Sequence, residues 1–565
     1  MNRRQHLPLT AMLCLALAAT AGCGGGEPSR GQAGAAPPPR AADGRPSLAV
    51  LIIVDQFRAD YLTRFASRFD GGFARLQREG LRFDGALHLH ATTQTSPGHA
   101  SLSTGVPPSR HGIIGNRWYE RESRQMVGCV QDAASPAFTG RGAGVSPSRM
   151  LAPSLGEWIK NASHYSRVVS ISGKETAATL LAGRKADAVF WYDRAAGRFT
   201  TSRYYASSEP EILVRFAKDK PVSALACASW ERLDGPGDLP EADPDLEPWE
   251  PPAFGGFPHR MPCPEGSGPP AMPAVKAQGL ESEVRLTPYL DDLTLDLAED
   301  AIVEYELGKD GAPDLLAISL SATDYIGHRY GPDSQEILDQ LRRLDRRLGR
   351  FLERIDRDVG LDHALIVLTG DHGTTSCPER DPSHRLERVQ TPELERRLEK
   401  AMTSRLGRGP WVAGIEADQV YLVDDSARSA SAALEELAQE PSMAHVYTRE
   451  ELAGEAQSPA DEYLPLMRAS WTRQRGGDMM VRLKQGWFLS ESPTGSEHGS
   501  PYPDDMRVPL IFRGPGITPG ARAERVAVYR AAPTIASLLG QAWPSDLPEG
   551  PLPMSPGSPM SPGAP

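Results

Sequence analysis

Residues 88–119 read HLHATTQTSPGHASLSTGVPPSRHGIIGNRWY, and the rest of the chain is organised around this stretch. A hydroxyl-rich loop, residues 91–96, meets Pro97 and then a run that can be helical, residues 99–104. Pro97 has no N–H group and its φ suits a first helical turn, so Thr95 lies at or just before a helix N-terminus. Unpaired N–H groups and the helix dipole stabilise an anion there. Thr95 is therefore either a helix cap, the commoner role of such a residue, or a nucleophile that attacks a bound oxyanion.

Length and charge limit the kinds of protein that this chain can be. At 565 residues it exceeds the usual size of one domain, so it contains one large α/β core with insertions or two to three domains. Its 54 glycines and 51 prolines indicate many loops. The net charge of −12 argues against a nucleic-acid-binding protein, which would normally carry a basic excess.

The first residues have the pattern of an export signal. Two arginines precede an apolar run, residues 7–21, which is too short for a membrane-spanning helix and ends in small residues. The tetrapeptide Thr20-Ala21-Gly22-Cys23 resembles a bacterial lipoprotein box, in which Cys23 is lipidated; an ordinary signal cleaved nearby is the alternative. We expect a signal peptide over residues 1–22 and an exported protein, periplasmic or at the cell surface, anchored to the membrane through Cys23.

Both ends of the remaining chain have low complexity. Residues 23–46 have no apolar periodicity and are rich in Gly, Ala and Pro, which predicts a flexible tether. Residues 546–565 end in a repeated Met-Ser-Pro-Gly, and we assign no chemistry to this tail. Residues 47–545 are left for the folded domain.

Apolar runs alternate with amphipathic segments in the folded domain. Three runs rich in β-branched residues predict buried strands of a parallel sheet, at residues 47–54, 314–320 and 364–368. Further strands are predicted at residues 81–89, 167–172, 188–192 and 508–512, and helices at 72–80, 155–161, 174–181, 286–307, 333–355 and 531–539. This alternation predicts an α/β fold with a doubly wound, mostly parallel central sheet and helices on both faces.

The periodicity fails in two segments, which we interpret as insertions into the core. Residues 194–285 are rich in proline, and residues 377–480 combine charged helices with a strand at 419–423. Cys227 and Cys263 flank the proline-rich region and are the best candidates for a disulfide in an exported chain.

Residues of the types that bind metals follow the predicted strands. They are Asp55, Asp324 with His328, Asp371 with His372, and His498. Each alone is more often a helix cap or a surface group, but three carboxylates and three imidazoles together suit zinc. Open α/β sheets bind ligands beyond the carboxyl ends of their strands, where we expect these six to meet. They divide into two sites of three, and two metals about 4 Å apart can clamp the attacking and leaving oxygens of a displacement at phosphorus.

Seven ordered motifs carry a resemblance to a known family. They are VDQFRADYL, TQTSPGHASLSTGVPPSRHGIIGNRWY, SGKETAATL, FWYD, ATDYIGHRYGPDS, TGDHG and EHGSPYPDDMRVPLIF, and they span nearly all of residues 47–545. With them the chain resembles the type I phosphodiesterase/nucleotide pyrophosphatase branch of the alkaline phosphatase superfamily, and more closely its bacterial alkaline phosphatases with a threonine nucleophile. The resemblance implies an alkaline phosphatase-like catalytic domain that needs two Zn²⁺ ions.

The resemblance also implies a role for each matching residue. Thr95 would be the nucleophile, and a phospho-threonine would be hydrolysed by water in a second step. One zinc ion would be held by Asp55, Asp371 and His372, with Thr95 as a further ligand, and the other by Asp324, His328 and His498. Asn116 and Lys174 would bind the phosphoryl oxygens.

One position departs from the family's pattern. The monoesterases have Lys-Asp-Arg where this chain has Lys174-Glu175-Thr176, and Thr176 cannot clamp a phosphate as a bidentate cation can. Arg184 or an arginine of an insertion is a candidate substitute.

The departure leaves two activities open. Lys174 favours a phosphomonoesterase that acts on small phosphorylated substrates, and Thr176 favours the alternative, a phosphodiesterase or nucleotide pyrophosphatase. A sulfatase would need Cys or Ser in place of Thr95. A non-catalytic surface lipoprotein would be expected to lose some of the ligands, and all six are present. The oligomeric state is not predicted.

Overall fold

The computed structural model describes residues 44–140, 142–250, 255–264, 279–381, 383, 385–456 and 460–555. The predicted signal peptide, Cys23, most of the predicted tether and residues 556–565 lie outside these described residues. Among the described residues, no helix combines the length and the apolar character needed to cross a bilayer.

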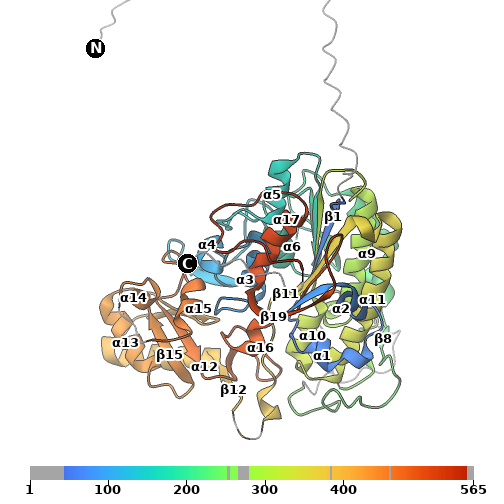
Figure 1. Cartoon of the computed structure of the whole chain (residues 1–565). Coiled ribbons are helices and arrows are strands. Elements are labelled where there is room, and N and C mark those ends of the chain that lie inside the picture. Colours follow the sequence, from blue (N-terminus) through green and yellow to red (C-terminus); the bar gives the residue numbers. More distant parts are fainter. Residues whose placement is uncertain are drawn as a thin grey trace, which may run out of the picture. The chain divides into compact units, whose positions relative to one another are not determined.

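The core is a nine-stranded sheet built from strands that are far apart in the sequence (Figure 1). In spatial order its strands are β19 (Gly520–Ala527), β2 (Leu81–Leu87), β18 (Leu510–Arg513), β11 (Ala364–Gly370), β1 (Leu48–Val54), β10 (Asp314–Leu320), β5 (Val168–Ser172), β6 (Ala188–Asp193) and β7 (Arg198–Thr200). The five central strands from β11 to β6 are parallel, β18 is antiparallel to both of its neighbours, and β7 is an antiparallel edge strand. The prediction of a doubly wound, mostly parallel sheet is confirmed.

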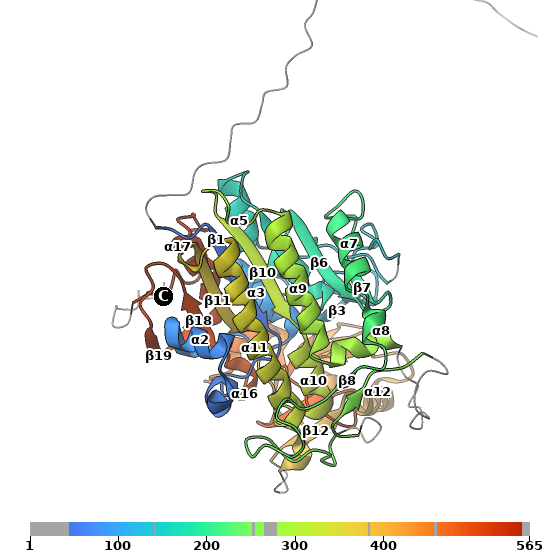
Figure 2. The same ribbon diagram turned by 90° about the vertical axis from the view of Figure 1, so that its right-hand side faces the viewer.

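Helices cover both faces of the sheet. Successive side chains of each buried strand point to opposite faces, so both faces are apolar and are buried by helices. Leu48, Val50 and Ile52 of β1 pack with α2 (Gly72–Glu79), α7 (Glu211–Asp219), α9 (Tyr289–Glu304) and α11 (Gln335–Asp358). Ala49 and Leu51 pack with α3 (Thr95–Thr104), α5 (Leu155–Ala162), α6 (Glu175–Ala182) and α17 (Ala531–Leu538). Figure 2 shows α9 and α11 lying across the first of these faces.

The register of the central strands brings their carboxyl ends to one level. Val54, the last residue of β1, is paired with Leu320 of β10 on one side and with Gly370 of β11 on the other. Asp55 and Asp371 therefore leave the sheet side by side. The helix after β10, α10 (Ala322–Tyr330), begins at the same edge.

Two edge strands, β7 and β19, are absent from the sequence prediction. β19 has the sequence GARAERVA, in which Ala521 and residues 523–525 are exposed, because an edge strand has only one neighbour to pack against. β7 is only three residues long and belongs to the first predicted insertion. Neither strand has the apolar run by which the central strands were recognised.

The two segments without periodicity fold differently from each other. Residues 194–285 contain β7, α7, a short ladder between β8 (Ser229–Trp230) and β9 (His259–Arg260), and α8 (Leu280–Glu283). The predicted disulfide between Cys227 and Cys263 is formed. Residues 377–480, with the three residues that follow, form the four-stranded sheet β13 (Val412–Glu416), β14 (Gln419–Leu422), β16 (Met479–Leu483) and β15 (Met443–Thr448), which packs against α12 (Thr391–Leu406) and α13 (Ala427–Leu437). The strand predicted at 419–423 is thus confirmed.

The remaining named elements are short. They are α1 (Tyr61–Arg64), α4 (Pro108–His111), β3 (Arg117–Glu120), β4 (Gln125–Gly128), β12 (Glu387–Gln390), α14 (Arg449–Leu452), α15 (Leu464–Ala469), β17 (Trp487–Ser490) and α16 (Pro503–Met506).

Residues 546–555, which the sequence places in a tail, pack against the core. Leu552 is buried, and its N–H donates to Thr534 Oγ1 at 2.8 Å. Arg530 donates to the carbonyl oxygens of Gly550 and Pro551.

Candidate active site

Thr95 is the first residue of α3 and does not cap it. The N-cap position is Gln94. Thr95 is 4% exposed, and its Oγ1 lies 3.2 Å from Lys174 Nζ and 3.4 Å from His372 Nε2. The capping alternative for Thr95 is therefore wrong, and its hydroxyl faces the predicted ligands.

A glycine places α3 against the end of β11. A Cβ atom on Gly98 would overlap the carbonyl group of Asp371, so a larger residue would push the helix away. This close approach explains why glycine stands between Thr95 and His99 in the organising stretch, and it brings Thr95 next to the carboxyl edge of the sheet.

Three of the predicted ligands form a buried group that we call the first ligand cluster: Asp55, Asp371 and His372. Each offers a ligand atom within 4.8 Å of the other two. His372 Nε2 lies 3.5 Å from Asp55 Oδ1 and 3.4 Å from Asp371 Oδ2. Asp55 Oδ1 is buried and accepts no hydrogen bond from any described residue, which is costly for a carboxylate unless a cation is bound.

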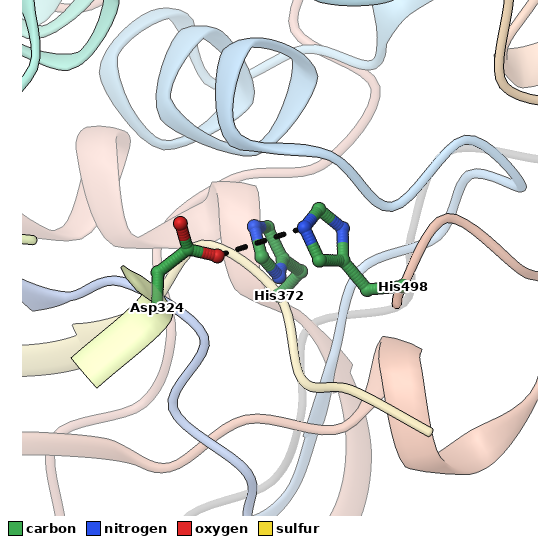
Figure 3. Close-up of side chains that lie close together, drawn as sticks. All are labelled: Asp324, His372 and His498. Atoms are coloured by element: carbon green, nitrogen blue, oxygen red, sulfur yellow. Dashed lines mark ion pairs between the residues drawn. The ribbon is translucent and has the colours of Figure 1, made fainter. Parts of the chain in front are cut away.

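The other three form the second ligand cluster: Asp324 and His328 from α10, and His498 from the loop after β17. Asp324 Oδ1 lies 3.2 Å from His328 Nε2 and 3.6 Å from His498 Nε2. The two clusters adjoin, because the rings of His372 and His498 stack with their centroids 3.7 Å apart. Figure 3 shows Asp324, His372 and His498 lying close together at this junction.

Backbone carbonyls hold all three histidines in one orientation. Nδ1 of His328, His372 and His498 lies 2.8–2.9 Å from the carbonyl oxygens of Ser496, Gly373 and Thr93, respectively. An Nδ1–H that donates to a carbonyl leaves Nε2 with a lone pair, the form in which histidine binds metals. His328 Nε2 and His498 Nε2 are only 3.2 Å apart. Two lone pairs at that separation repel, and either a shared proton or a cation bound by both nitrogens removes the repulsion. The Nε2 atoms of these residues therefore fit a metal ion that displaces the proton.

Lys174, the residue before α6, is the cation of this site. Its Nζ lies 2.7 Å from Asp55 Oδ2 and 2.5 Å from Asp324 Oδ2. Burial disfavours the charged ammonium, but Asp324 and Asp55 outweigh burial and raise the pKa of Lys174 well above its usual value. Lys174 is therefore a permanent positive charge that links the two clusters.

Burial and charge separate the pKa values of the ligands. Burial, followed by Asp371, raises the pKa of Asp55 well above its usual value. Burial lowers the pKa of His372 and of His498, which keeps both rings neutral at physiological pH. At His328 burial is outweighed by Asp324 and Glu497, which raise its pKa to about 9.

Asn116 is fixed on the N-terminus of α3. Its Oδ1 accepts a hydrogen bond from Ser96 N–H at 2.9 Å, and its own N–H donates to Gln94 Oε1 at 3.1 Å. Because Oδ1 is occupied, the amide nitrogen is the group left to act as a donor. The structure thus brings Thr95, Asn116 and Lys174 together with the six ligands.

The structure separates the two candidates for the missing arginine. Arg184 follows α6, whereas Lys174 precedes it, so the helix holds them roughly 14 Å apart. Arg184 pairs with Glu157 instead, and its proposed substitution is wrong. Arg285, the last residue of the first insertion, has its guanidinium carbon 5.0 Å from the ring centroid of Tyr325. Lys174 Nζ is 5.0 Å from the same centroid.

Sequence reasoning missed several residues that position the ligands. Gln56 Nε2 donates to Asp324 Oδ1, and Gln56 N–H donates to Asp371 Oδ1, both at 3.1 Å. His99 Nδ1 lies 3.2 Å from Asp371 Oδ2. Glu497 Oε2 lies 3.5 Å from His328 Nδ1. Gln56, His99 and Glu497 all lie inside the quoted motifs. Their sequence positions close to the predicted site residues could have identified them.

A cavity of about 230 Å³ opens next to the second ligand cluster. His498, Gln94 and Glu497 line it, together with Ile415 and Glu416 from the second insertion. A larger cavity of about 470 Å³ lies against β2 and β18, and its described lining contains none of the predicted site residues. The smaller cavity is the better candidate for binding the leaving group of a substrate.

Comparison with known proteins identifies the family. Residues 49–504 match the model of the type I phosphodiesterase/nucleotide pyrophosphatase family. The chain is 30% identical to alkaline phosphatase PafA of Elizabethkingia meningoseptica over 517 residues, which covers 89% of this chain and 93% of that protein. It is 32% identical to alkaline phosphatase PhoK of a Sphingomonas species over 534 residues, which covers 89% and 90%.

Solved structures agree with this assignment. A crystal structure of wild-type alkaline phosphatase PafA superposes with a TM-score of 0.81 at 28% identity, covering 90% of this chain and 98% of that one. A murine ectonucleotide pyrophosphatase/phosphodiesterase shares the fold with a TM-score of 0.51 at 13% identity. The chain therefore belongs to the type I phosphodiesterase/nucleotide pyrophosphatase family of the alkaline phosphatase superfamily, and it is a phosphoric ester hydrolase.

Proposed function

We propose that residues 47–545 form a zinc-dependent phosphomonoesterase that transfers the phosphoryl group to Thr95 and then to water. One observation carries this proposal: the Thr95 hydroxyl stands on a helix N-terminus between Lys174 and the two ligand clusters. A nucleophile, a fixed cation and six metal-type ligands at one point are the parts that in-line phosphoryl transfer needs.

The donor atoms favour zinc in both clusters. Asp55, Asp371 and His372 would hold one ion together with Thr95, and the second cluster would hold the other. A mixture of carboxylate oxygens and imidazole nitrogens is typical of zinc sites. Zinc bound in the two clusters would supply the Lewis acidity that makes an alcohol a nucleophile near neutral pH and stabilises a departing alkoxide.

The side chains around Thr95 perform the remaining steps. Thr95 Oγ1 gives up its proton to water and attacks phosphorus in line with the leaving oxygen, which departs as an alkoxide with the bonding electron pair and takes a proton from water. Lys174 and the amide nitrogen of Asn116 would donate to the equatorial phosphoryl oxygens, where negative charge accumulates in the transition state. Water then attacks phospho-Thr95, and the threonine oxygen departs.

The relatives support this use of the three residues. A solved variant of PafA carries replacements of one threonine, one asparagine, one lysine and one arginine. Its threonine and asparagine stand 21 positions apart, as Thr95 and Asn116 do here. The curated relatives PafA and PhoK are both named alkaline phosphatases.

Phosphodiester hydrolysis is the second candidate function. The replaced arginine of PafA stands two positions after its lysine, and the matching position here is Thr176. A monoester dianion carries one more negative charge than a diester, so loss of that arginine weakens monoester binding more. We favour the monoester because Lys174 is retained and Arg285 lies no more than about 10 Å from Lys174 Nζ.

A paired assay on zinc-loaded protein tests the proposal. We expect kcat/KM for p-nitrophenyl phosphate to exceed that for bis-p-nitrophenyl phosphate by at least about 10²-fold, since the additional charge meets Lys174 in a partly water-excluded site. A preference for the diester would mean that the protein is a phosphodiesterase and not a phosphomonoesterase.

The export signal and the lipid anchor at Cys23 remain part of the proposal. Mass spectrometry of the protein from its native membrane fraction would find a lipid-modified Cys23 at the mature N-terminus. A soluble product cleaved at another position would contradict the anchor.

A further inference from the structure

A third group of acidic side chains lies outside the active site, where the first insertion meets the core. It consists of Asp245 and Glu250 from the insertion and Glu336 from the first turn of α11, and we call it the acidic cluster. Each of the three offers a ligand oxygen within 4.8 Å of the others. Glu336 is fully buried and Glu250 is 5% exposed.

Each carboxylate of the acidic cluster uses one oxygen and leaves the other unpartnered. Asp245 Oδ2 accepts from Phe257 N–H at 2.9 Å, Glu250 Oε2 accepts from Leu246 N–H at 3.1 Å, and Glu336 Oε1 lies 2.8 Å from His259 Nε2. The second oxygens, Asp245 Oδ1, Glu250 Oε1 and Glu336 Oε2, are buried and accept no hydrogen bond within the described part of the chain. Anchored carboxylates with one buried oxygen left over are the pattern expected of ligands held ready for a cation.

Two basic side chains contact the three carboxylates of the acidic cluster in the described part of the chain, His259 at Glu336 and Arg232 at Asp245. Arg232 lies 2.9 Å from Asp245 Oδ2, but it also pairs with Asp238 at 2.8 Å. Three carboxylates at this separation repel one another strongly when burial removes them from water. A divalent cation would remove most of this repulsion.

We propose that the acidic cluster binds one Ca²⁺ ion that fastens the first insertion to α11. All three ligand atoms are carboxylate oxygens, the donors that hard cations prefer. The ring nitrogen that contacts Glu336 in the described structure, His259 Nε2, is engaged in a hydrogen bond with Glu336 Oε1. Calcium accepts six to eight oxygens in flexible geometry, so water and backbone carbonyls complete its shell. The donor set differs from that of the first and second ligand clusters, together called the catalytic clusters, and selects a different metal.

The acidic cluster is connected to the active site through the residue before Glu250. The carbonyl oxygen of Trp249 accepts a hydrogen bond from Gly495 N–H at 3.3 Å, and Gly495 opens the loop that carries His498. His259, which contacts Glu336, also lies 3.4 Å from the hydroxyl of Tyr330 at the end of α10. Calcium would therefore stabilise the loops behind the second ligand cluster without contacting substrate.

Equilibrium dialysis with ⁴⁵Ca²⁺ on the zinc-loaded protein, in buffer that contains zinc, tests this site. We expect saturable binding of about one Ca²⁺ per chain and a melting temperature that rises by several degrees with Ca²⁺. Glu250→Gln should weaken binding at least about tenfold, because it removes one of three charged ligands. Glu247→Gln, three positions away in the same loop, is the matched control and should bind as the wild type does.

Two further variants locate the bound ion. His498→Ala removes a catalytic ligand and should leave Ca²⁺ binding intact, whereas Asp245→Asn should weaken it as Glu250→Gln does. The absence of saturable Ca²⁺ binding to folded wild-type protein, or binding that His498→Ala abolishes and Glu250→Gln preserves, would overturn the proposal. Both outcomes are independent of whether the enzyme prefers monoesters.

Discussion

The catalytic clusters and the acidic cluster are both buried groups of carboxylates, yet they differ in donor atoms and in origin. The catalytic clusters combine three carboxylates with three imidazoles whose Nδ1 atoms are held by carbonyl oxygens. The acidic cluster has only carboxylates, each anchored through one oxygen. The difference teaches that the donor atoms decide which metal a cluster suits: imidazole nitrogens mixed with carboxylate oxygens favour zinc, and carboxylate oxygens alone favour a hard cation such as calcium.

The largest expected effect separates chemistry from metal binding at the catalytic clusters. Thr95→Ala should lower kcat/KM by at least about 10³-fold while leaving zinc bound, because the six principal ligands remain. Steady-state kinetics and metal analysis of the same preparation check this. Ser96→Ala is the matched control, because it removes the hydroxyl of the neighbouring residue. Ser96 Oγ accepts a hydrogen bond from Cys129 Sγ at 3.0 Å. Undiminished turnover in Thr95→Ala would remove Thr95 from its role.

The next effect tests whether the imidazoles make the catalytic clusters zinc sites. His498→Ala should reduce zinc content by about one ion per chain and activity by on the order of 10²-fold or more, since even outer partners of metal ligands are worth 10–100-fold. Glu497→Gln, at the neighbouring position, should have a smaller effect and retain both ions. Elemental analysis showing unchanged zinc in His498→Ala would break the comparison.

A third effect concerns the cation between the two catalytic clusters. Lys174→Ala should lower kcat/KM for a monoester by about 10²–10³-fold, the usual cost of removing one preorganised partner of a transition-state charge. The loss for a diester should be smaller, because a diester carries less charge on its phosphoryl oxygens. Kinetics with both p-nitrophenyl substrates measure this; equal losses would show that Lys174 acts only on its carboxylate neighbours.

The smallest effect concerns Arg285, which approaches Tyr325 from the first insertion. Arg285→Ala should lower the monoester-to-diester ratio of kcat/KM by about three- to tenfold, as expected for a cation that shares the Tyr325 ring with Lys174 in a partly solvated site. Arg285→Lys should retain most of the ratio, and Arg184→Ala should not change it. A ratio unaffected by Arg285→Ala would exclude this residue as the substitute for the arginine that Thr176 replaces.

Three carboxylate ligands were predictable from sequence because each follows an apolar strand (Asp55, Asp324 and Asp371), whereas His498 lies in the loop after β17. Asp55 and Asp371 stand directly after β1 and β11, and the parallel register aligns the ends of those strands. The alignment of such ends is a property of the fold class, so the strands alone predict that the residues meet. The helix at Thr95 was likewise predicted, but only the structure excludes the capping role, because Gln94 takes the N-cap position and the Thr95 hydroxyl lies 3.2 Å from Lys174 Nζ.

The acidic cluster was not predictable in the same way. Asp245 and Glu250 lie in a proline-rich segment without periodicity, and Glu336 lies in the helix predicted at 333–355, where one acidic residue among many charged ones gives no sign of a partner. Their meeting depends on how the insertion is folded, with Cys227 and Cys263 joined inside it, and on how it is held to α11 by Gln335, which donates to the carbonyl oxygens of Leu239 and Asp243. No local pattern encodes these contacts.

The most direct test of the central claim is a zinc titration of the metal-stripped enzyme, with Ca²⁺ held constant, while hydrolysis of a phosphate monoester is measured. We predict that activity rises with zinc and reaches its plateau at about two equivalents per chain, one for each ligand cluster. Full activity before any zinc is added, or a plateau that does not depend on the catalytic ligands, would contradict a two-zinc centre at the carboxyl edge of the sheet.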